Sequence, residues 1–210
     1  MTTPAIPFTI EPMQPSHITE ISRLLVHGFN GKFLTMANLK EDALAYFFEH
    51  LLSCYPSTPA SHRMVAIQGG NVIGTISYKW KPSIGTRYVQ RYPRLTSFHP
   101  LRKWSLVKLF YGLHVLEHDP KDGECYIADI AVHPAHRSQG VGTHLLQHAK
   151  QVVQRETHLQ WLSLHVSSKN KRAEELYKQM AFRKHSTRNS LASHLLFNEP
   201  TWSYMTLHVK

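Results

Sequence analysis

The segment best suited to chemistry joins an apolar run to a glycine-containing loop. Residues 126–132 are mostly apolar, and beyond Pro134 the chain continues as Arg137, Ser138, Gln139, Gly140, Val141 and Gly142. Apolar side chains take helical spacing from this loop onward, which predicts a helix beginning there. The first turn of a helix presents unpaired N–H groups and a partial positive charge. We therefore expect the loop to bind a phosphate or pyrophosphate, with Arg137 adding charge. A tight packing turn is the alternative use of the two glycines.

A second motif, about 25 residues later, places a tyrosine on a predicted helix. Residues 170–182 read N-K-R-A-E-E-L-Y-K-Q-M-A-F, and Ala173, Leu176, Tyr177 and Met180 are spaced for one apolar face. The spacing alone leaves two roles open for Tyr177, a buried core side chain or a proton donor.

Together these motifs resemble the GNAT superfamily of acetyl-CoA-dependent N-acetyltransferases. That family has a strand like I-A-V-x-P, the loop R-x-x-G-x-G, and then N-x-x-A-x-x-L-Y-x-x-x-G-F. All three occur here in that order, over residues 124–182. Ser138 and Ala181 depart from the pattern, because relatives often or usually have glycine at these positions. The resemblance implies an α+β fold with a mostly antiparallel central sheet flanked by helices, and acetyl-CoA as co-substrate.

The resemblance also implies a role for each matching residue. Backbone N–H groups from Arg137 to Gly142 would hold the CoA pyrophosphate, and Asn170 would hydrogen-bond the pantetheine region. The strand edge at Ile130, Ala131 and Val132 would pair with the pantetheine arm, and an N–H there could polarise the thioester carbonyl. Tyr177 would donate a proton to the departing thiolate.

Two carboxylates on the same predicted strand are candidates for the general base. An ammonium acceptor must lose a proton before it can attack, and Glu124 or Asp129 could take that proton, directly or through water. The resemblance favours Glu124, since many relatives carry a glutamate at the start of this strand. Odd spacing puts the two side chains on opposite faces of a regular strand, so only one would face the cleft unless a bulge intervenes. The alternatives are a solvated carboxylate at Glu124 and a buried, hydrogen-bonded one at Asp129.

The remaining periodicity predicts a single α+β domain over residues 1–210. Gly69 and Gly70 predict a hairpin turn. Strands are expected at 8–10, 63–68, 72–80, 124–132, 159–166 and 202–209, and helices at 16–25, 41–52, 104–117, 140–156 and 173–180. Residues 82–100 read as irregular.

Positive charge is concentrated in one part of the chain. Lys and Arg outnumber Asp and Glu by 24 to 14, and residues 79–108 hold eight of them with no acid. This basic segment lies between the second hairpin strand and the predicted cofactor strand, so we expect it to form a wall or lid of the acceptor cleft. A solvated surface is one alternative, and a surface that helps to hold the CoA phosphates or an anionic acceptor is a second. Binding of single-stranded nucleic acid is another, because aromatic residues alternate with the charges.

Several protein classes are disfavoured. Two cysteines are too few for a disulfide framework. The N-terminus does not resemble a secretion signal, and no apolar run approaches the ~18–20 residues of a membrane span, so a soluble cytoplasmic protein is expected. His144 and His148 have helical i, i+4 spacing but no evident third ligand, so no metal site is predicted.

The prediction is therefore an N-acetyltransferase that transfers acetyl directly to a primary amine in a ternary complex. A catalytically inactive CoA-binding or regulatory module and a basic nucleic-acid-binding protein are the alternatives. The net charge of +10 disfavours a polycationic acceptor, unless acidic residues cluster in the cleft. The family resemblance also allows a homodimer.

Overall fold

The computed structural model contains one seven-stranded sheet in the order β1-β2-β3-β4-β5-β7-β6. It describes residues 7–29, 32–54, 60–82, 95–189, 196–198 and 201–210. The strands are β1 (Thr9–Pro12), β2 (Ser61–Gln68), β3 (Asn71–Trp80), β4 (Glu124–Val132), β5 (Trp161–Ser167), β6 (Arg183–Asn189) and β7 (Thr201–His208). Neighbouring strands are antiparallel except for β4 and β5. The predicted α+β class with a mostly antiparallel sheet is confirmed.

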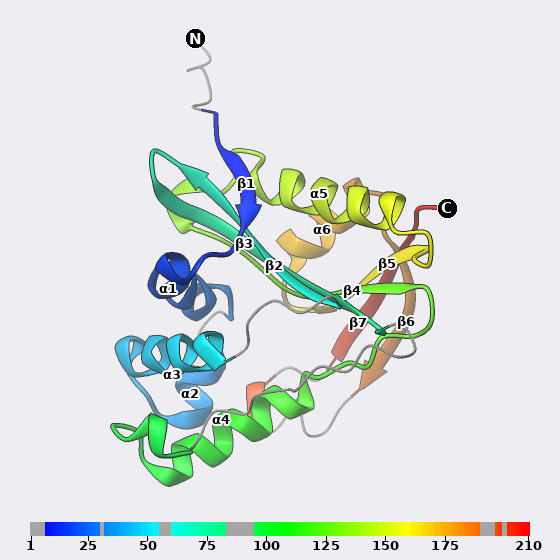
Figure 1. Cartoon of the computed structure of the whole chain (residues 1–210). Coiled ribbons are helices and arrows are strands. Elements are labelled where there is room, and N and C mark those ends of the chain that lie inside the picture. Colours follow the sequence, from blue (N-terminus) through cyan, green and yellow to red (C-terminus); the bar gives the residue numbers. More distant parts are fainter. Residues whose placement is uncertain (1–6, 30–31, 55–59, 83–94, 190–195, 199–200) are drawn as a thin grey trace.

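Helices cover both faces of the sheet and create two hydrophobic cores (Figure 1). The α-helices are α1 (Ile18–Gly28), α2 (Lys32–Ala37), α3 (Glu41–Cys54), α4 (Lys103–Val115), α5 (Val141–Arg155) and α6 (Lys171–Gln179). Short 3-10 turns occupy Pro15–His17, Leu95–Phe98 and Pro134–His136. Helices α5 and α6 pack on one face, where Leu145, Leu146 and Tyr177 join the core. Helices α1 to α4 pack on the other face.

Strand β4 contains a bulge that changes which side chains share a face. Ser77 of β3 pairs with Asp129, but the next residue, Tyr78, pairs with Ile127, so Ala128 is the extra residue. Because alternation restarts after a bulge, Glu124, Tyr126 and Asp129 all point to the side of α1 to α4. The bulge that would allow both carboxylates to face the cleft is therefore present, and Glu124 and Asp129 lie on one face.

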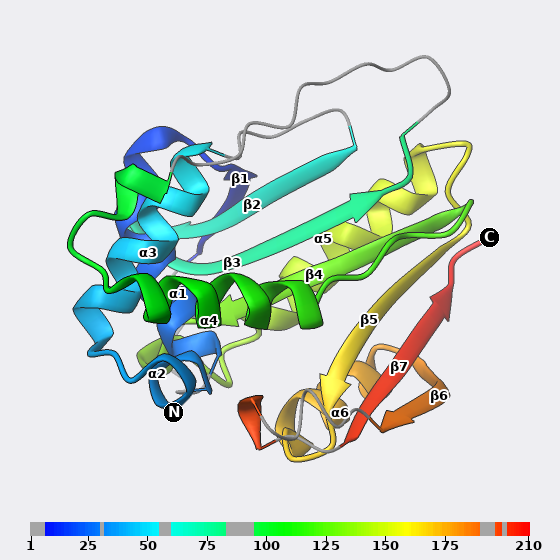
Figure 2. The ribbon, with the colours of Figure 1, turned by 90° about the horizontal axis from the view of Figure 1, so that it is seen from below.

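Strands β4 and β5 separate just beyond this bulge. Their pairing covers only residues 124–127 of β4 and 161–164 of β5. Figure 2 shows the two strands diverging from there. The fork leaves the β5-facing edge of β4 without a neighbouring strand from Ala128 onward, although β3 still pairs with the other edge as far as Val132.

Most predicted elements occur within a few residues of their expected bounds, but two elements were missed. Helix α2 and strand β6 were not predicted, and β6 is exposed along its whole length. The turn at Gly69 and Gly70 is confirmed, with positive φ at both glycines. The predicted irregular stretch lies largely outside the described residues.

The two positions that depart from the family's glycines both have left-handed backbone. Ser138 has a φ of 62° and Ala181 a φ of 66°. A side chain disfavours this conformation, which explains why glycine is the usual residue at each place.

Candidate active site

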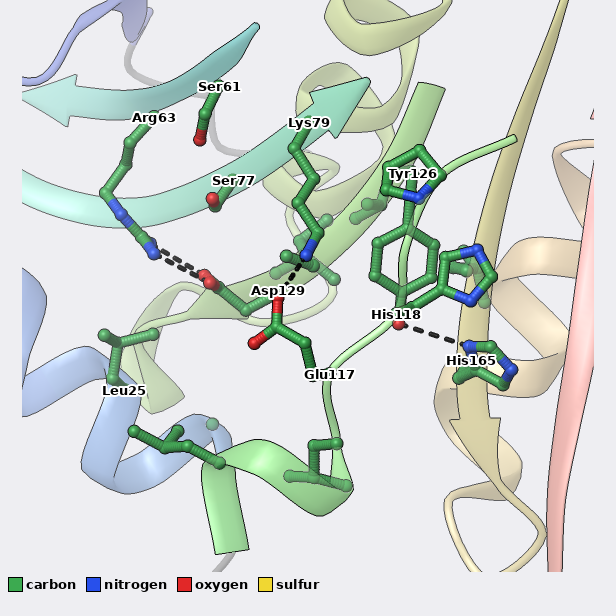
Figure 3. A pocket seen from close by; sticks show the side chains of 18 of the residues that line it. Leu25, Ser61, Arg63, Ser77, Lys79, Glu117, His118, Tyr126, Asp129 and His165 are labelled. Carbon is green, nitrogen blue, oxygen red and sulfur yellow. Dashed lines mark hydrogen bonds and ion pairs between the residues drawn. The ribbon is translucent and has the colours of Figure 1, made fainter. Parts of the chain in front are cut away.

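A cleft of about 1270 Å³ passes from the α1–α4 face of the sheet to the fork between β4 and β5. Apolar side chains of α1, α3 and α4 line one wall, among them Leu25, Leu52 and Leu113, while Asn170 and Tyr177 of the α6 segment line the other end. The floor is polar, because Ser61, Arg63, Ser77, Lys79, Tyr126, Asp129 and His165 of four adjacent strands point into it (Figure 3). The cleft therefore connects the two faces of the sheet beside the open edge of β4.

The loop between β4 and α5 has the geometry of an anion-binding site. Gly140 is the N-cap of α5 with a φ of 82°, and the N–H groups of Val141 and Gly142 make no main-chain hydrogen bond with a described residue. Arg137 is exposed, and its Nε donates to the Val132 carbonyl over 3.3 Å. No acidic residue lies in the first turn of this 15-residue helix. Anions are favoured at such a helix start.

Helix α6 joins this loop and brings two predicted residues to the cleft. The Arg172 Nη2 atom donates to the Ser138 hydroxyl over 2.8 Å, so the loop and the first turn of α6 are linked. The side-chain oxygen of Asn170, Oδ1, caps α6 by accepting from the Ala173 N–H, which leaves the side-chain nitrogen, Nδ2, available as a donor. The predicted pyrophosphate-binding loop and the start of α6, which carries Asn170, are thus in direct contact.

Tyr177 is both a core residue and a cleft residue. Its side chain is buried against Phe182, yet it lines the cleft. The hydroxyl makes no hydrogen bond with a described residue, and it remains accessible to solvent. Burial raises the pKa of Tyr177 above its ordinary value, so the phenol stays protonated at neutral pH. Tyr177 is therefore a buried core residue whose protonated hydroxyl lines the cleft, so the role of proton donor stays a prediction.

Glu124 is fully buried and surrounded by donors, so it is not the solvated carboxylate that was the alternative at this position. Its Oε1 atom accepts from His118 Nε2 (2.9 Å), from the Tyr204 hydroxyl (2.8 Å) and from the Ser163 hydroxyl. Its Oε2 atom accepts from the Lys121 N–H over 2.7 Å. Burial alone would raise the pKa of Glu124, but the four hydrogen bonds outweigh it and lower the pKa to about 2. Glu124 does not itself line the cleft.

Asp129 lines the cleft but is held by an arginine. Arg63 of β2 binds both carboxylate oxygens of Asp129, at 2.7 Å each (Figure 3). Arg63 also donates to the Thr75 hydroxyl. The two side chains are 12% and 18% exposed. A bidentate pair this well shielded fixes the carboxylate in place. Asp129 therefore matches the buried, hydrogen-bonded alternative more closely than a free base.

Three side chains that the sequence analysis did not single out gather beside the bulge. His118, from the loop before β4, packs against Tyr126 with ring centroids 4.3 Å apart and ring planes tilted by 35°, and the Tyr126 hydroxyl lies 3.2 Å from His165 Nδ1. All three line the cleft. Burial, together with the neighbouring His118, lowers the pKa of His165 to about 4. The sequence contains sixteen histidines, and nothing in it singles out His118 and His165, because their proximity depends on the pairing of β4 with β5.

Among the described residues of the basic segment 79–108, only some reach the cleft. Lys79 and Lys81 line it, and each pairs with an acid, Lys79 with Glu117 (2.5 Å) and Lys81 with Asp122 (2.8 Å). Arg102, Lys103 and Lys108 are exposed on or beside α4 and are not part of the cleft lining. Residues 83–94 lie outside the described part of the chain.

Other features bear on the remaining predictions. Cys125 is buried, and burial together with Glu124 raises its thiol pKa to about 12, which makes it an inert core residue. Across the described residues, no three His, Cys, Asp or Glu side chains gather as metal ligands. Within the same residues, no helix is both long and apolar enough to cross a membrane.

Comparison with known proteins defines the class. The sequence profile of the acetyltransferase (GNAT) family matches residues 33–182, so the chain belongs to this family of acetyl-transferring proteins. No curated protein matches the sequence.

Solved structures share the fold over nearly the whole chain. An N-acetyltransferase from Staphylococcus aureus Mu50 is 21% identical with a TM-score of 0.65, covering 95% of this chain and 100% of that one. NAA60 from Arabidopsis thaliana, in complex with acetyl-CoA, is 16% identical with a TM-score of 0.57, covering 96% and 98%. The protein yncA from Salmonella typhimurium, also with acetyl-CoA, is 15% identical with a TM-score of 0.57, covering 97% and 95%.

Proposed function

We propose that this protein is an N-acetyltransferase that transfers the acetyl group of acetyl-CoA directly to a primary amine. The observation that carries the proposal is the cleft that crosses the sheet at the β4–β5 fork, with an anion-binding loop near one end and a buried tyrosine beside the opening. Family membership and the acetyl-CoA complexes of NAA60 and yncA support it.

The residues around the fork fit acetyl-CoA. The N–H groups from Arg137 to Gly142 would bind the pyrophosphate, aided by the Arg137 guanidinium. The unpaired edge of β4 at Ile130, Ala131 and Val132 would hydrogen-bond the pantetheine amides as an added strand does, and Asn170 would donate its free amide N–H groups. The bound co-substrate supplies an acetyl thioester, whose carbonyl carbon is open to attack by an amine.

The transfer requires one proton donor and one proton acceptor. The amine nitrogen forms a bond to the thioester carbonyl carbon, the C–S bond breaks, and the thiolate takes the proton of the Tyr177 hydroxyl. Tyr177 then recovers the proton that the new amide nitrogen loses. A phenol that stays protonated at neutral pH and lacks a competing hydrogen-bond partner among the described residues suits this donor role.

The proton acceptor for the incoming ammonium belongs on the face that carries Glu124 and Asp129. Asp129 is bound to Arg63, so it would act as a carboxylate held in a fixed position near the amine. Glu124 lies behind His118, so its contribution to the base is indirect.

The charge balance of the cleft favours an acceptor with one positive charge. Among the described residues that line it there are three acids: Glu117 and Asp129 are each bound to a cation, and Asp119 is exposed near the rim. A polyamine or an aminoglycoside needs several free carboxylates, whereas the apolar wall from α1, α3 and α4 suits the body of an alkyl or aromatic monoamine. The acceptor proposed is therefore a primary monoamine with an apolar substituent.

Two measurements test the proposal. Calorimetric titration with acetyl-CoA, with inorganic phosphate as control, should show micromolar binding. Thiol release from acetyl-CoA should then be followed with phenethylamine, tyramine, octylamine, spermidine and kanamycin, and the monoamines should give the highest kcat/KM. Binding without turnover on any amine would point to an inactive CoA-binding module. Absence of binding at millimolar acetyl-CoA, combined with salt-sensitive binding of oligonucleotides, would point to a nucleic-acid-binding protein.

A further inference from the structure

His118 connects the buried carboxylate of Glu124 to the cleft. Its Nε2 atom lies 2.9 Å from Glu124 Oε1, and the side chain is 18% exposed where it lines the cleft. The other ring nitrogen, Nδ1, makes no hydrogen bond with a described residue and remains accessible to solvent. The Tyr126 ring packs against the imidazole with centroids 4.3 Å apart and restricts its movement.

The environment of Glu124 determines the protonation of this ring. A carboxylate that accepts from three other donors and has a pKa near 2 is ionised throughout the neutral range, so its contact with His118 Nε2 requires a proton on Nε2. Neutral His118 is therefore the Nε2–H tautomer, with the lone pair of Nδ1 free. When Nδ1 takes a proton, the negative charge of Glu124 stabilises the imidazolium that forms.

We propose that His118 is the general base of the acetyl transfer, and that Glu124 is the positioning residue that fixes its tautomer and stabilises its protonated form. The inference rests on the proposed function and names the group that activates the amine. Nδ1 of His118 takes one proton from the acceptor ammonium, directly or through one water. The free amine then attacks the thioester carbon, and the imidazolium returns its proton to solvent. The sum is ammonium plus thioester giving amide, thiol and one proton.

Other titratable groups near His118 do not take its place. The titratable and charged side chains that surround it are Glu124 and Tyr126 of β4, His165 of β5, Tyr204 of β7, and Glu117 with its partner Lys79. Both tyrosines have a raised pKa, mainly through burial, and stay neutral. His165, with a pKa lowered to about 4, is neutral as well and much the weaker base. Glu117 and Lys79 carry opposite charges in contact, and the other charged residues of the described lining nearby, Asp119 and Arg188, are exposed to solvent. Glu124 is therefore the buried charge in direct contact with the ring.

The test compares His118→Gln, Glu124→Gln and the control His208→Gln. Glutamine at 118 can still donate a hydrogen bond to Glu124 but cannot accept a proton at neutral pH. His208 is exposed at the end of β7 and outside the cleft lining. Thermal unfolding establishes that each variant is folded, and calorimetry establishes its affinity for acetyl-CoA. The kinetic measurement is kcat/KM from pH 5 to 10, with two monoamines of different pKa, so that a limb caused by the amine moves between substrates.

The expected result is a loss of about 10²–10³-fold in kcat for His118→Gln, with unchanged affinity for acetyl-CoA and loss of the acid limb that is common to both amines. Glu124→Gln should retain that limb but move it to lower pH, because the imidazolium loses its counter-charge. A merely structural Glu124 would lower stability without moving the limb. The inference is overturned if His118→Gln keeps the acid limb and a kcat within threefold of wild type.

A readout without turnover separates this inference from the proposed function. The imidazole nitrogen shifts of His118 in the full-length protein, measured by NMR during a pH titration, should show the Nε2–H tautomer and a protonation step that moves to lower pH in Glu124→Gln. A His118 that stays in one state from pH 5 to 9, or shows the Nδ1–H tautomer, refutes the base assignment even if no amine is turned over. Turnover with an unaltered His118→Gln profile refutes the base assignment and leaves acetyl transfer standing.

Discussion

The buried carboxylate of Glu124 should make folding stability depend on pH in a measurable way. Its pKa falls from an ordinary 4.5 to about 2 in the folded protein. At 1.36 kcal/mol per pKa unit, the folded state gains about 3 kcal/mol at neutral pH. Because the folded pKa is the lower one, this stabilisation is complete well above pH 4.5 and is lost as the pH falls toward 2. By pH 3.5 about 1–1.5 kcal/mol of it should be gone.

Replacing Glu124 by Gln removes this dependence and measures it. Urea unfolding of wild type and Glu124→Gln should be followed by circular dichroism at pH 7, 5, 4 and 3.5, with the exposed Glu175→Gln as control. The variant should be about 2–4 kcal/mol less stable at pH 7, since a buried network of charged hydrogen bonds is broken. The difference from wild type should shrink by about 1–1.5 kcal/mol at pH 3.5. A difference that is the same at pH 7 and pH 3.5 would refute the depressed pKa, and with it the claim that the four donors keep Glu124 ionised.

Two further substitutions test the proposed cofactor residues, and a third tests the left-handed backbone at Ala181. Tyr177→Phe should lower kcat about 10²-fold in the amine assay and leave acetyl-CoA affinity within twofold, because the hydroxyl is needed only as a proton donor; full activity would remove Tyr177 from the mechanism. Gly140→Val should weaken acetyl-CoA binding at least ~10-fold by calorimetry, since a side chain at a φ of 82° strains the backbone that presents the N–H groups. The control is Gly70→Val, which has the same φ in the β2–β3 turn and should leave binding unchanged. Ala181→Gly should stabilise the protein by about 1 kcal/mol and raise Tm by about 2–4 °C, because glycine relieves the left-handed φ of 66°; an unchanged or lower Tm would contradict that account.

The local motifs predicted the elements that carry the proposed cofactor residues, because those elements are specified by residues close in sequence. The loop at 137–142 opens α5 as expected, and Tyr177 and Asn170 reach the cleft together. Nothing in the composition of residues 183–189 indicated β6, since RKHSTRN has neither alternating apolar residues nor strong strand formers. That strand forms because β7 offers an edge to pair with, which is a property of the sheet and not of the segment.

The acceptor side could not be predicted for a related reason. His118 and Glu124 are six residues apart, yet the same carboxylate also binds Ser163 and Tyr204, which come from β5 and β7. Burial of Glu124 follows from this assembly of three strands, so the carboxylate is fully enclosed, which neither the predicted base at the cleft nor the solvated alternative had anticipated. The arginine that neutralises Asp129 lies 66 positions away along the chain and was equally out of reach of local patterns.

The extra residue at Ala128 brings two carboxylates five positions apart onto one face of β4. Deleting Ala128 alone would leave a regular strand in which the two carboxylates are four positions apart, so both would keep their face and their pairing with β3. Deleting a second residue from the same stretch would put them on opposite faces, and either the contact with Arg63 or the contacts of Glu124 would be lost. The strand can therefore absorb the loss of one residue at this point but not of two. Among descendants, a form of β4 that is shorter by one residue should be compatible with both carboxylate sites.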